Sequence, residues 1–139
     1  MGDMGEALAA SSTPASLPVC LLAEDEAVLA TLLEVEFTEA GFEVAGPFKR
    51  VEDALAWLEN ATPDIAVIDT MLADGSSATL ALALKQRSVR FVVHSGSAPR
   101  ANGTDDAFTG APWLTKPMLP DTVVETAQRV LRVREWDLG

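Results

Sequence analysis

Acidic side chains follow two short apolar runs in this sequence. Glu24, Asp25 and Glu26 come directly after the run VCLLA, and Asp69 comes directly after IAVI. Carboxylates that lie close together repel one another unless a cation is bound between them, and an all-oxygen site of this kind suits Mg²⁺. The acidic residues therefore predict a divalent-cation site, if the fold brings the two segments together.

Two other apolar runs are followed by groups that could hold the oxygen atoms of a phosphoryl group. Ser95 follows FVVH, and Lys116 follows WLT. Asp69 can act as a nucleophile that forms an aspartyl phosphate, while the metal, the lysine and the hydroxyl stabilise the charge on the phosphoryl oxygens. Catalysis of phosphoryl transfer consists mostly of such positioning and electrostatics. The set therefore suits transfer of a phosphoryl group onto Asp69.

These residues can meet only if the apolar runs form strands of one sheet. Short apolar runs alternate with helical patterns from residue 19 onwards, which is typical of parallel β-α units. The expected strands are residues 19–23, 42–45, 65–68, 91–93 and 113–114, and the expected helices are residues 27–40, 51–60, 76–86 and 120–134. The pattern predicts an α/β fold with a doubly wound, five-stranded parallel sheet. Ligands bind such sheets beyond the carboxyl ends of the strands, where the residues named above lie.

Three local signals refine the helices. Gly41 is expected to end the first helix, and Ser76 or Ser77 to cap the third. The stretch APRANGTDDAFTG, residues 98–110, consists mainly of turn-forming residues and cannot bury a helical stripe. The fourth helix is therefore expected to be short, irregular or mobile.

Composition limits the remaining possibilities. The chain has 139 residues, of which 48% are hydrophobic, and this is enough for one domain. Its net charge of −11 argues against binding to nucleic acid or to anionic membrane surfaces. No stretch approaches the roughly 18 apolar residues of a membrane span. The single cysteine, Cys20, is expected to fill the core in a reducing cytosol, so a cytoplasmic location is predicted. The single histidine, His94, is expected to be packed or solvent-facing rather than a phosphocarrier.

The ends of the chain are expected to lie outside the domain. Residues 1–17 lack the basic start and the continuous apolar run of a secretory signal, and they are interpreted as a disordered leader. Residues 136–139 are interpreted as a short tail. Residues 18–135 would then form one stand-alone domain, because no room remains for a second one.

Over residues 18–134 the sequence resembles the response-regulator receiver domains of two-component signalling. The resemblance rests on four segments, LLAEDE, PDIAVIDTMLADG, HSG and TKP. It implies a flavodoxin-like (βα)5 fold with strand order 2-1-3-4-5. It also implies a signalling domain rather than an enzyme, one that catalyses at most its own phosphorylation and dephosphorylation.

The resemblance assigns roles around the expected metal. Asp69 would be the phosphoacceptor and would also contact Mg²⁺ or Mn²⁺. Asp25 would bind the metal directly, Glu24 mostly through water, and the backbone carbonyl of Met71 would complete the protein's share of the ligands.

The resemblance assigns three further roles at the other strand ends. Lys116 would pair with the acceptor or its phosphate, and Ser95 would donate a hydrogen bond to a phosphoryl oxygen. Trp113 stands where the family has an aromatic residue that changes rotamer together with the hydroxyl residue, so Ser95 and Trp113 would form the switch.

The segment RFVVHSGS, residues 90–97, is similar to the PFxFATGY stretch of a group of alphaproteobacterial single-domain receivers called FATGUY. The family implies a sensor histidine kinase or a histidine phosphotransferase as phosphodonor, together with a downstream protein partner. The chain would be a monomer or a weak homodimer.

Alternative functions can be weighed against the same residues. A flavodoxin-like cofactor binder needs a phosphate-binding loop after the first strand, whereas EDE at this position would repel phosphate. A haloacid-dehalogenase-type phosphatase needs the motif DxDxT, which is absent because Asp69 is followed by Thr70 and Met71. A receiver that acts as a phosphorylation-independent interaction module remains the alternative.

Overall fold

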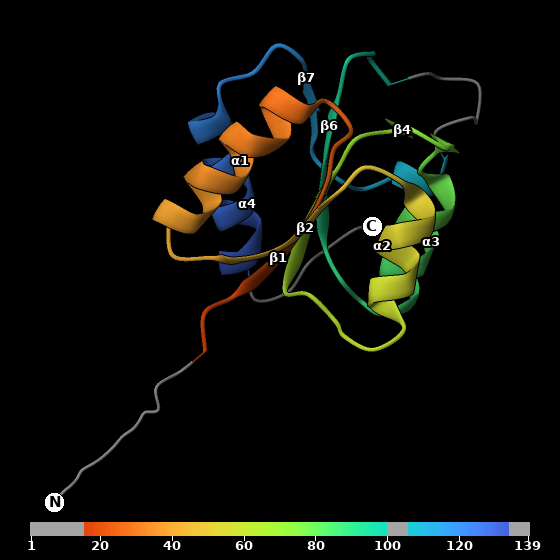
Figure 1. Ribbon diagram of the computed structural model, residues 1–139, viewed down its shortest axis with the longest axis horizontal. Coiled ribbons are helices and arrows are strands. Elements are labelled where there is room, and N and C mark those ends of the chain that lie inside the picture. The colour runs from red at the N-terminus through yellow and green to blue at the C-terminus, as the bar shows by residue number, and fades with distance from the viewer. Residues whose placement is uncertain (1–15, 100–105, 134–139) are drawn as a thin grey trace, which may run out of the picture.

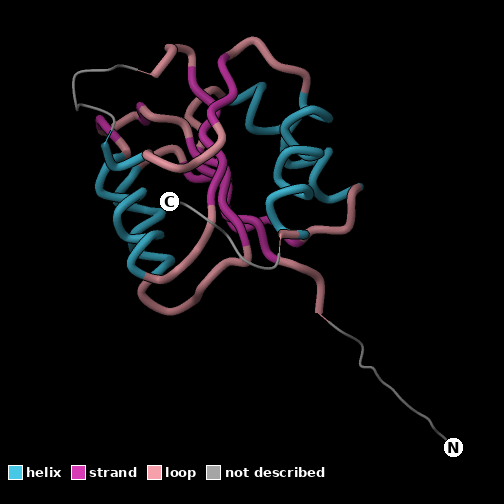
Figure 2. Tube along the Cα trace, turned by 180° about the vertical axis from the view of Figure 1, so that it is seen from behind, coloured by secondary structure: helices cyan, strands magenta, loops and turns pink. Residues whose placement is uncertain are grey.

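A five-stranded parallel sheet lies between two pairs of helices in the computed structural model, which describes residues 16–99 and 106–133 (Figures 1 and 2). The strands of this sheet are β1 (Val19–Ala23), β2 (Glu43–Phe48), β3 (Ile65–Ile68), β6 (Phe91–Ser95) and β7 (Trp113–Thr115). The helices are α1 (Ala27–Glu39), α2 (Val51–Leu58), α3 (Ala78–Gln86) and α4 (Pro120–Arg132). The strand order is β2-β1-β3-β6-β7, which confirms the predicted order 2-1-3-4-5 when only these five strands are counted.

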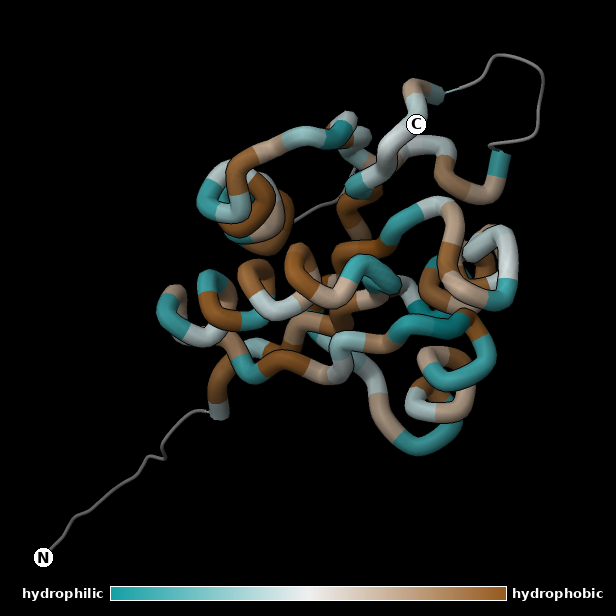
Figure 3. The backbone as a smooth tube through the Cα atoms, turned by 45° about the horizontal axis from the view of Figure 1, so that its top comes forward, coloured by the Kyte–Doolittle hydropathy of each residue, from teal (hydrophilic) through white to brown (hydrophobic). Residues whose placement is uncertain are grey.

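Both faces of the sheet are buried, which explains why its strands are almost continuously apolar. In β3 the side chains of Ala66 and Ile68 pack on the side of α2 and α3, whereas those of Ile65 and Val67 pack on the side of α1 and α4. Figure 3 shows hydrophobic segments in the middle of the molecule and hydrophilic ones mainly in its loops. Cys20 is buried on the side of α1 and α4, as expected for a core residue, and burial raises the pKa of its thiol.

Gly41 ends α1, as predicted. Its φ of 97° lies in the left-handed region, which glycine adopts without steric cost. The amide of Gly41 donates to the carbonyl of Thr38 at 3.1 Å, and the amide of Phe42 donates to the carbonyl of Phe37 at 3.0 Å. This is the pair of bonds that satisfies the last carbonyls of a helix in a Schellman motif. The rings of Phe37 and Phe42 then meet edge to face, with centroids 5.1 Å apart.

β2 continues three residues beyond the predicted end, because Gly46 and Pro47 form an irregularity within the strand rather than a turn. The pairing with β1 shifts there, from Leu21 opposite Ala45 to Ala23 opposite Phe48. A Cβ atom at Gly46 would lie 2.7 Å from the carbonyl oxygen of Leu22, so only glycine fits. The strand thereby reaches the start of the acidic loop that follows β1.

A small antiparallel hairpin between β3 and α3 was not predicted. It consists of β4 (Met71–Leu72) and β5 (Gly75–Ser76), which lie outside the main sheet. Strands of two residues are too short to show any hydrophobic period. The predicted cap of α3 is also only partly right. Ser77 occupies the N-cap position, but its hydroxyl donates to the carbonyl of Asp69, while the hydroxyl of Ser76 accepts from the amide of Ala78.

The connection between β6 and β7 is expected to contain a helix that is short, irregular or mobile. The described part of this connection forms one 3₁₀ turn, η1 (Asp106–Phe108). The expectation of mobility concerns residues 97–110, and residues 100–105 of this stretch lie outside the described residues. The last helix, α4, follows on the other side of the sheet. Of the apolar stripe expected on it, Val123, Val124, Ala127 and Val130 are buried, whereas Leu131 is only partly buried.

Arg90 holds the end of α4. Its guanidinium group donates to the carbonyl of Val130 at 2.8 Å and to that of Val133. The carbonyl of Val130 also accepts from the amide of Val133 at 3.3 Å, and a cation at a helix C-terminus interacts favourably with the helix dipole. In the resemblance to the PFxFATGY stretch, which stays a prediction, Arg90 stands in the place of proline.

The predicted leader and tail lie almost entirely outside the described residues. The domain limits of 18 and 135 therefore stay predictions. Among the described residues, no helix has both the length and the hydropathy that a membrane span requires.

Candidate functional site

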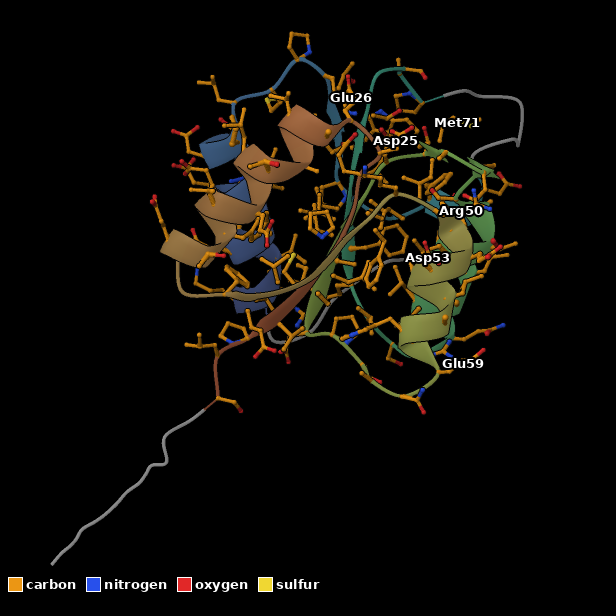
Figure 4. The ribbon with its side chains drawn as sticks, viewed as in Figure 1. Asp25, Glu26, Arg50, Asp53, Glu59 and Met71 are labelled. Carbon is orange, nitrogen blue, oxygen red and sulfur yellow. The ribbon has the colours of Figure 1, made fainter. Side chains whose placement is uncertain are left out.

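Three loops with charged residues meet at the carboxyl end of the sheet. The loop after β1 carries the acidic residues 24–26, the loop after β3 begins with Asp69, and the loop after β7 carries Lys116. These loops come together because β1 and β3 are neighbours and β6 and β7 continue the sheet. Figure 4 shows Met71 at this end of the molecule and Glu59 at the opposite end.

Three carboxylates form a cluster at the centre of this site. One oxygen atom from each of Glu24, Asp25 and Asp69 lies within 4.8 Å of the others. Glu24 is buried, and burial raises the pKa of its carboxyl group, although the amide of Glu26 and Lys116 counteract this effect. The backbone of Glu24 is fixed by a bond from its amide to the carbonyl of Phe48 at 2.9 Å. The extension of β2 thus positions the first of the three carboxylates.

Lys116 joins the two acidic loops. Its ammonium group donates to Asp69 Oδ2 at 2.8 Å, to Glu24 Oε2 at 3.1 Å and to Glu26 Oε1 at 3.0 Å. Burial alone would lower the pKa of Lys116, but the hydrogen bonds to the three carboxylates outweigh this effect and raise it. Lys116 is therefore charged at neutral pH and offsets part of the negative charge around it.

Asp69 is held on both its main chain and its side chain. Its amide donates to the carbonyl of Ala23 at 3.1 Å, and its carbonyl accepts from the hydroxyl of Ser77. Its Oδ1 atom accepts from the amide of Met71 at 3.3 Å. Both carboxylate oxygens thus face hydrogen-bond donors, and the group is held at the end of β3 in a fixed orientation.

Ser95 ends β6 next to Asp69, but its hydroxyl bonds to other groups. Ser95 Oγ lies 2.8 Å from Thr70 Oγ1 and accepts from the amide of Ser97 at 3.2 Å. Trp113 lies on the adjacent strand, and its indole nitrogen donates to the carbonyl of Ser97 at 2.9 Å. The two residues expected to form a switch are therefore connected through the loop after β6.

His94 precedes Ser95 and is packed inside the molecule. This is one of the two positions, packed or solvent-facing, that were predicted for it. The side chain is 1% exposed, and neither ring nitrogen has a hydrogen-bond partner among the residues that the structure describes. Burial, and secondarily the charge of Lys116, lowers the pKa of His94 to about 4. The ring is thus neutral at physiological pH.

The site opens to solvent through a cleft of about 1070 Å³. The cleft extends from the acidic loops to the first turns of α1, and its walls include Asp25, Asp69, Ser95, Lys116 and Val28. A phosphoryl group and a hydrated cation fit in this volume. The carboxylate cluster supplies the hard oxygen ligands that Mg²⁺ prefers, and the open side leaves room for the water molecules that this ion retains.

Five site residues are predicted from the sequence to share one edge of the sheet, and all of them line or adjoin this cleft. They are Glu24, Asp25, Asp69, Ser95 and Lys116. Two contacts were not predicted. Glu26 belongs to the acidic triplet, but its bond to Lys116 had not been foreseen, and the contact between Thr70 and Ser95 has no sequence signal. Thr70 directly follows the acidic strand end, which is the one feature that could have drawn attention to it.

Comparison with known proteins gives a consistent result. No family model and no curated protein matches the sequence. Among solved structures, the chain is similar to SdrG from Sphingomonas melonis Fr1, with 32% identity over 86% of this chain and 99% of that one, and a TM-score of 0.69. A response regulator receiver protein from Sinorhizobium medicae WSM419 shares 24% identity over 86% of this chain and 98% of that one, with a TM-score of 0.75.

A CheY-like receiver domain from Methanospirillum hungatei JF-1 shares 24% identity over 84% of this chain and 94% of that one, with a TM-score of 0.73. The last two likenesses concern the fold, and they agree with the strand order described above. Together with the match to SdrG, which has the higher sequence identity, and with the site described above, they lead to one assignment. This chain belongs to the family of response-regulator receiver domains.

Proposed function

We propose that this domain accepts a phosphoryl group on Asp69 in a Mg²⁺-dependent reaction and passes the signal on through a changed protein-binding surface or through a phosphorelay. The observation that carries the proposal is the contact of Lys116 with Asp69, 2.8 Å long, beside a cluster of three carboxylates in an open cleft. This arrangement combines a nucleophile, a cation that offsets charge and a set of metal ligands.

In the transfer step, an oxygen of Asp69 forms a bond to phosphorus while the bond between phosphorus and the donor's leaving atom breaks. The electron pair of that bond departs with the leaving group, which is an imidazole nitrogen of a kinase or a carboxylate oxygen of acetyl phosphate. Lys116 stays beside the acceptor and binds a phosphoryl oxygen. Ser95 would donate to another one after its hydroxyl has turned towards Asp69.

The carboxylate cluster would hold the metal through Asp25 and Asp69 directly and through Glu24 by way of water. The carbonyl of Met71 would be the remaining protein ligand. When bound, Mg²⁺ would neutralise the charge that develops on the phosphoryl oxygens. The burial of Glu24 supports this role, because a buried carboxylate gains from a nearby cation.

The exposed side of α1 offers a place for the kinase or phosphotransferase. Val28, Leu32 and Val35 are exposed apolar residues spaced four and three positions apart, so they lie on one face of the helix. Val28 and Leu32 also line the cleft. A protein docked on this face would bring its phosphohistidine to the open side of the site. The resemblance to the FATGUY group stays a prediction.

Intact-mass spectrometry tests the proposal. Wild type, Asp69→Asn and, as a matched control, Asp53→Asn on the exposed face of α2 would be treated with acetyl phosphate, with Mg²⁺ or with EDTA. Wild type and Asp53→Asn are expected to gain one phosphoryl group only with Mg²⁺, and Asp69→Asn to gain none. Equal adducts on all three proteins would contradict the proposal. No adduct on any of them would favour a phosphorylation-independent interaction module.

A further inference from the structure

Thr70 holds the hydroxyl group of Ser95 in the unmodified protein. The two hydroxyl oxygens are 2.8 Å apart, and the amide of Ser97 adds a second bond to Ser95 Oγ at 3.2 Å. Ser95 is 1% exposed, so water reaches it poorly and these two groups satisfy its hydrogen-bonding capacity. Its hydroxyl is directed to Thr70 and Ser97, and among the described residues it makes no bond to Asp69 or Lys116.

The same loop is bound to the neighbouring strand. Trp113 donates from its indole nitrogen to the carbonyl of Ser97 at 2.9 Å, and its ring meets that of Phe108 edge to face at 6.0 Å. Hydrogen bonds therefore join Thr70 to Ser95, the amide of Ser97 to Ser95, and Trp113 to the carbonyl of Ser97. A movement of the Ser95 hydroxyl takes the acceptor away from the Ser97 amide. The carbonyl that accepts from Trp113 belongs to the same residue, Ser97.

We infer that Thr70 is a positioning residue that restrains Ser95 in the unphosphorylated state and so sets how readily the site accepts a phosphoryl group. This inference rests on the proposed function. A phosphoryl oxygen on Asp69 attracts the Ser95 hydroxyl through a charge-assisted hydrogen bond, which is about twice as strong as a bond between neutral groups. To form this bond, the Ser95 hydroxyl has to leave Thr70. The free energy lost with the Thr70 contact offsets part of the free energy gained from the phosphoryl oxygen.

Removal of the Thr70 hydroxyl should therefore favour the phosphorylated arrangement. In Thr70→Val the shape of the side chain is kept but the bond to Ser95 is lost. Because a hydrogen bond between neutral groups contributes about 0.5–1.5 kcal/mol, the variant should bind beryllofluoride, a phosphoryl analogue, roughly 2- to 13-fold more tightly in Mg²⁺. Thr70→Ser retains the hydroxyl and should restore the wild-type affinity.

The experiment is a beryllofluoride titration followed by NMR amide signals. Thr31→Val serves as the matched control, because Thr31 on α1 is exposed and its hydroxyl donates to the carbonyl of Ala27, away from the site. This control should bind as wild type does. Ser95→Ala and the double variant Thr70→Val/Ser95→Ala should have equal affinities, since Thr70 acts through Ser95.

A readout without any phosphoryl analogue keeps the test independent of the titration. The amide signal of Ser97 and the indole signal of Trp113, identified with Trp113→Phe, should shift in Thr70→Val and return in Thr70→Ser. Unchanged signals would overturn the inference, as would a Thr70→Val affinity equal to or weaker than that of wild type. If wild type itself does not bind beryllofluoride, the proposed function fails and the inference fails with it.

Discussion

Lys116 bonds to three carboxylates at once, of which those of Glu24 and Asp69 are buried, whereas that of Glu26 is exposed. Its bonds to Asp69, Glu24 and Glu26 lie between 2.8 and 3.1 Å. A buried carboxylate without such a partner would cost several kcal/mol. Even so, one ammonium group cannot neutralise three carboxylates, so the site retains negative charge that favours a bound cation.

His94 is the other titratable group in this region, and its environment predicts a pH effect. Besides burial, the charges of Lys116, Asp69 and Glu26 act on its pKa. Its pKa is about 4 in the folded chain, against an ordinary value of 6.5. Between these two values the unfolded chain binds a proton that the folded chain does not. The stability contributed by the neutral ring is thus complete above pH 6.5 and is lost as the pH falls towards 4.

Replacement of His94 by leucine should remove this pH dependence. Urea unfolding at pH 7 and pH 4.5 is expected to show a decrease in the free energy of unfolding that is about 2 kcal/mol smaller for His94→Leu than for wild type. The raised pKa of Glu24 acts in the opposite direction but is common to both proteins, so it cancels in the comparison. Parallel pH profiles for the two proteins would show that His94 does not titrate in this way.

The hairpin formed by β4 and β5 connects the loop of the phosphoacceptor with α2. Asp74 at its tip accepts from the amides of Val51 and Glu52, at 2.7 and 3.1 Å. The amide of Ala73 also donates to the carbonyl of Lys49 at 2.9 Å. Asp74 therefore caps a helix that is distant in sequence, and the bond from Val51 is the main reason why its pKa is lowered.

Asp74→Ala should loosen both the start of α2 and the hairpin. Hydrogen exchange of the Val51 and Glu52 amides is expected to become faster, because these groups lose their acceptors. Mg²⁺ affinity should also fall, since Met71 begins the same hairpin. Asp53→Ala is the matched control and should leave both quantities nearly unchanged. Equal exchange rates in the two variants would contradict this role of Asp74.

Element boundaries show where sequence reasoning succeeded and where it did not. Gly41 correctly marked the end of α1, because the left-handed position needs glycine. The predicted strand 42–45 ends too early, because Gly46 and Pro47 form an irregularity inside β2 and pairing with β1 continues to Phe48. The role of Asp74 depends on a contact between residues more than twenty positions apart, which no local pattern encodes.

At the scale of the molecule, the position of the site follows from the order of the strands. Once the alternation of strands and helices indicates a parallel sheet, the residues after each strand must share one edge, and so Glu24, Asp25 and Asp69 could be predicted together. The direction of each side chain could not be predicted in this way. Glu26 reaches Lys116, and Thr70 reaches Ser95, because the backbone turns into the loops at particular angles.

A metal ion bound at this edge should stabilise the whole domain. An ion present at ten times its dissociation constant contributes about 1.4 kcal/mol, which corresponds to a rise of roughly 3–6 °C in the melting temperature. Mg²⁺ is expected to produce this rise in wild type and in Asp53→Asn, but not in Asp25→Asn, at constant ionic strength. A rise of the same size in Asp25→Asn would show that Mg²⁺ binds elsewhere.

Direct identification of the modified residue tests the central claim most sharply. Borohydride reduces an aspartyl phosphate to homoserine, so the protein would be treated with acetyl phosphate and Mg²⁺, reduced with borohydride and digested for tandem mass spectrometry. The account predicts homoserine at position 69 and at no other aspartate, and none when Mg²⁺ is replaced by EDTA. Homoserine at another position, or an unmodified Asp69 under conditions that phosphorylate the protein, would contradict it.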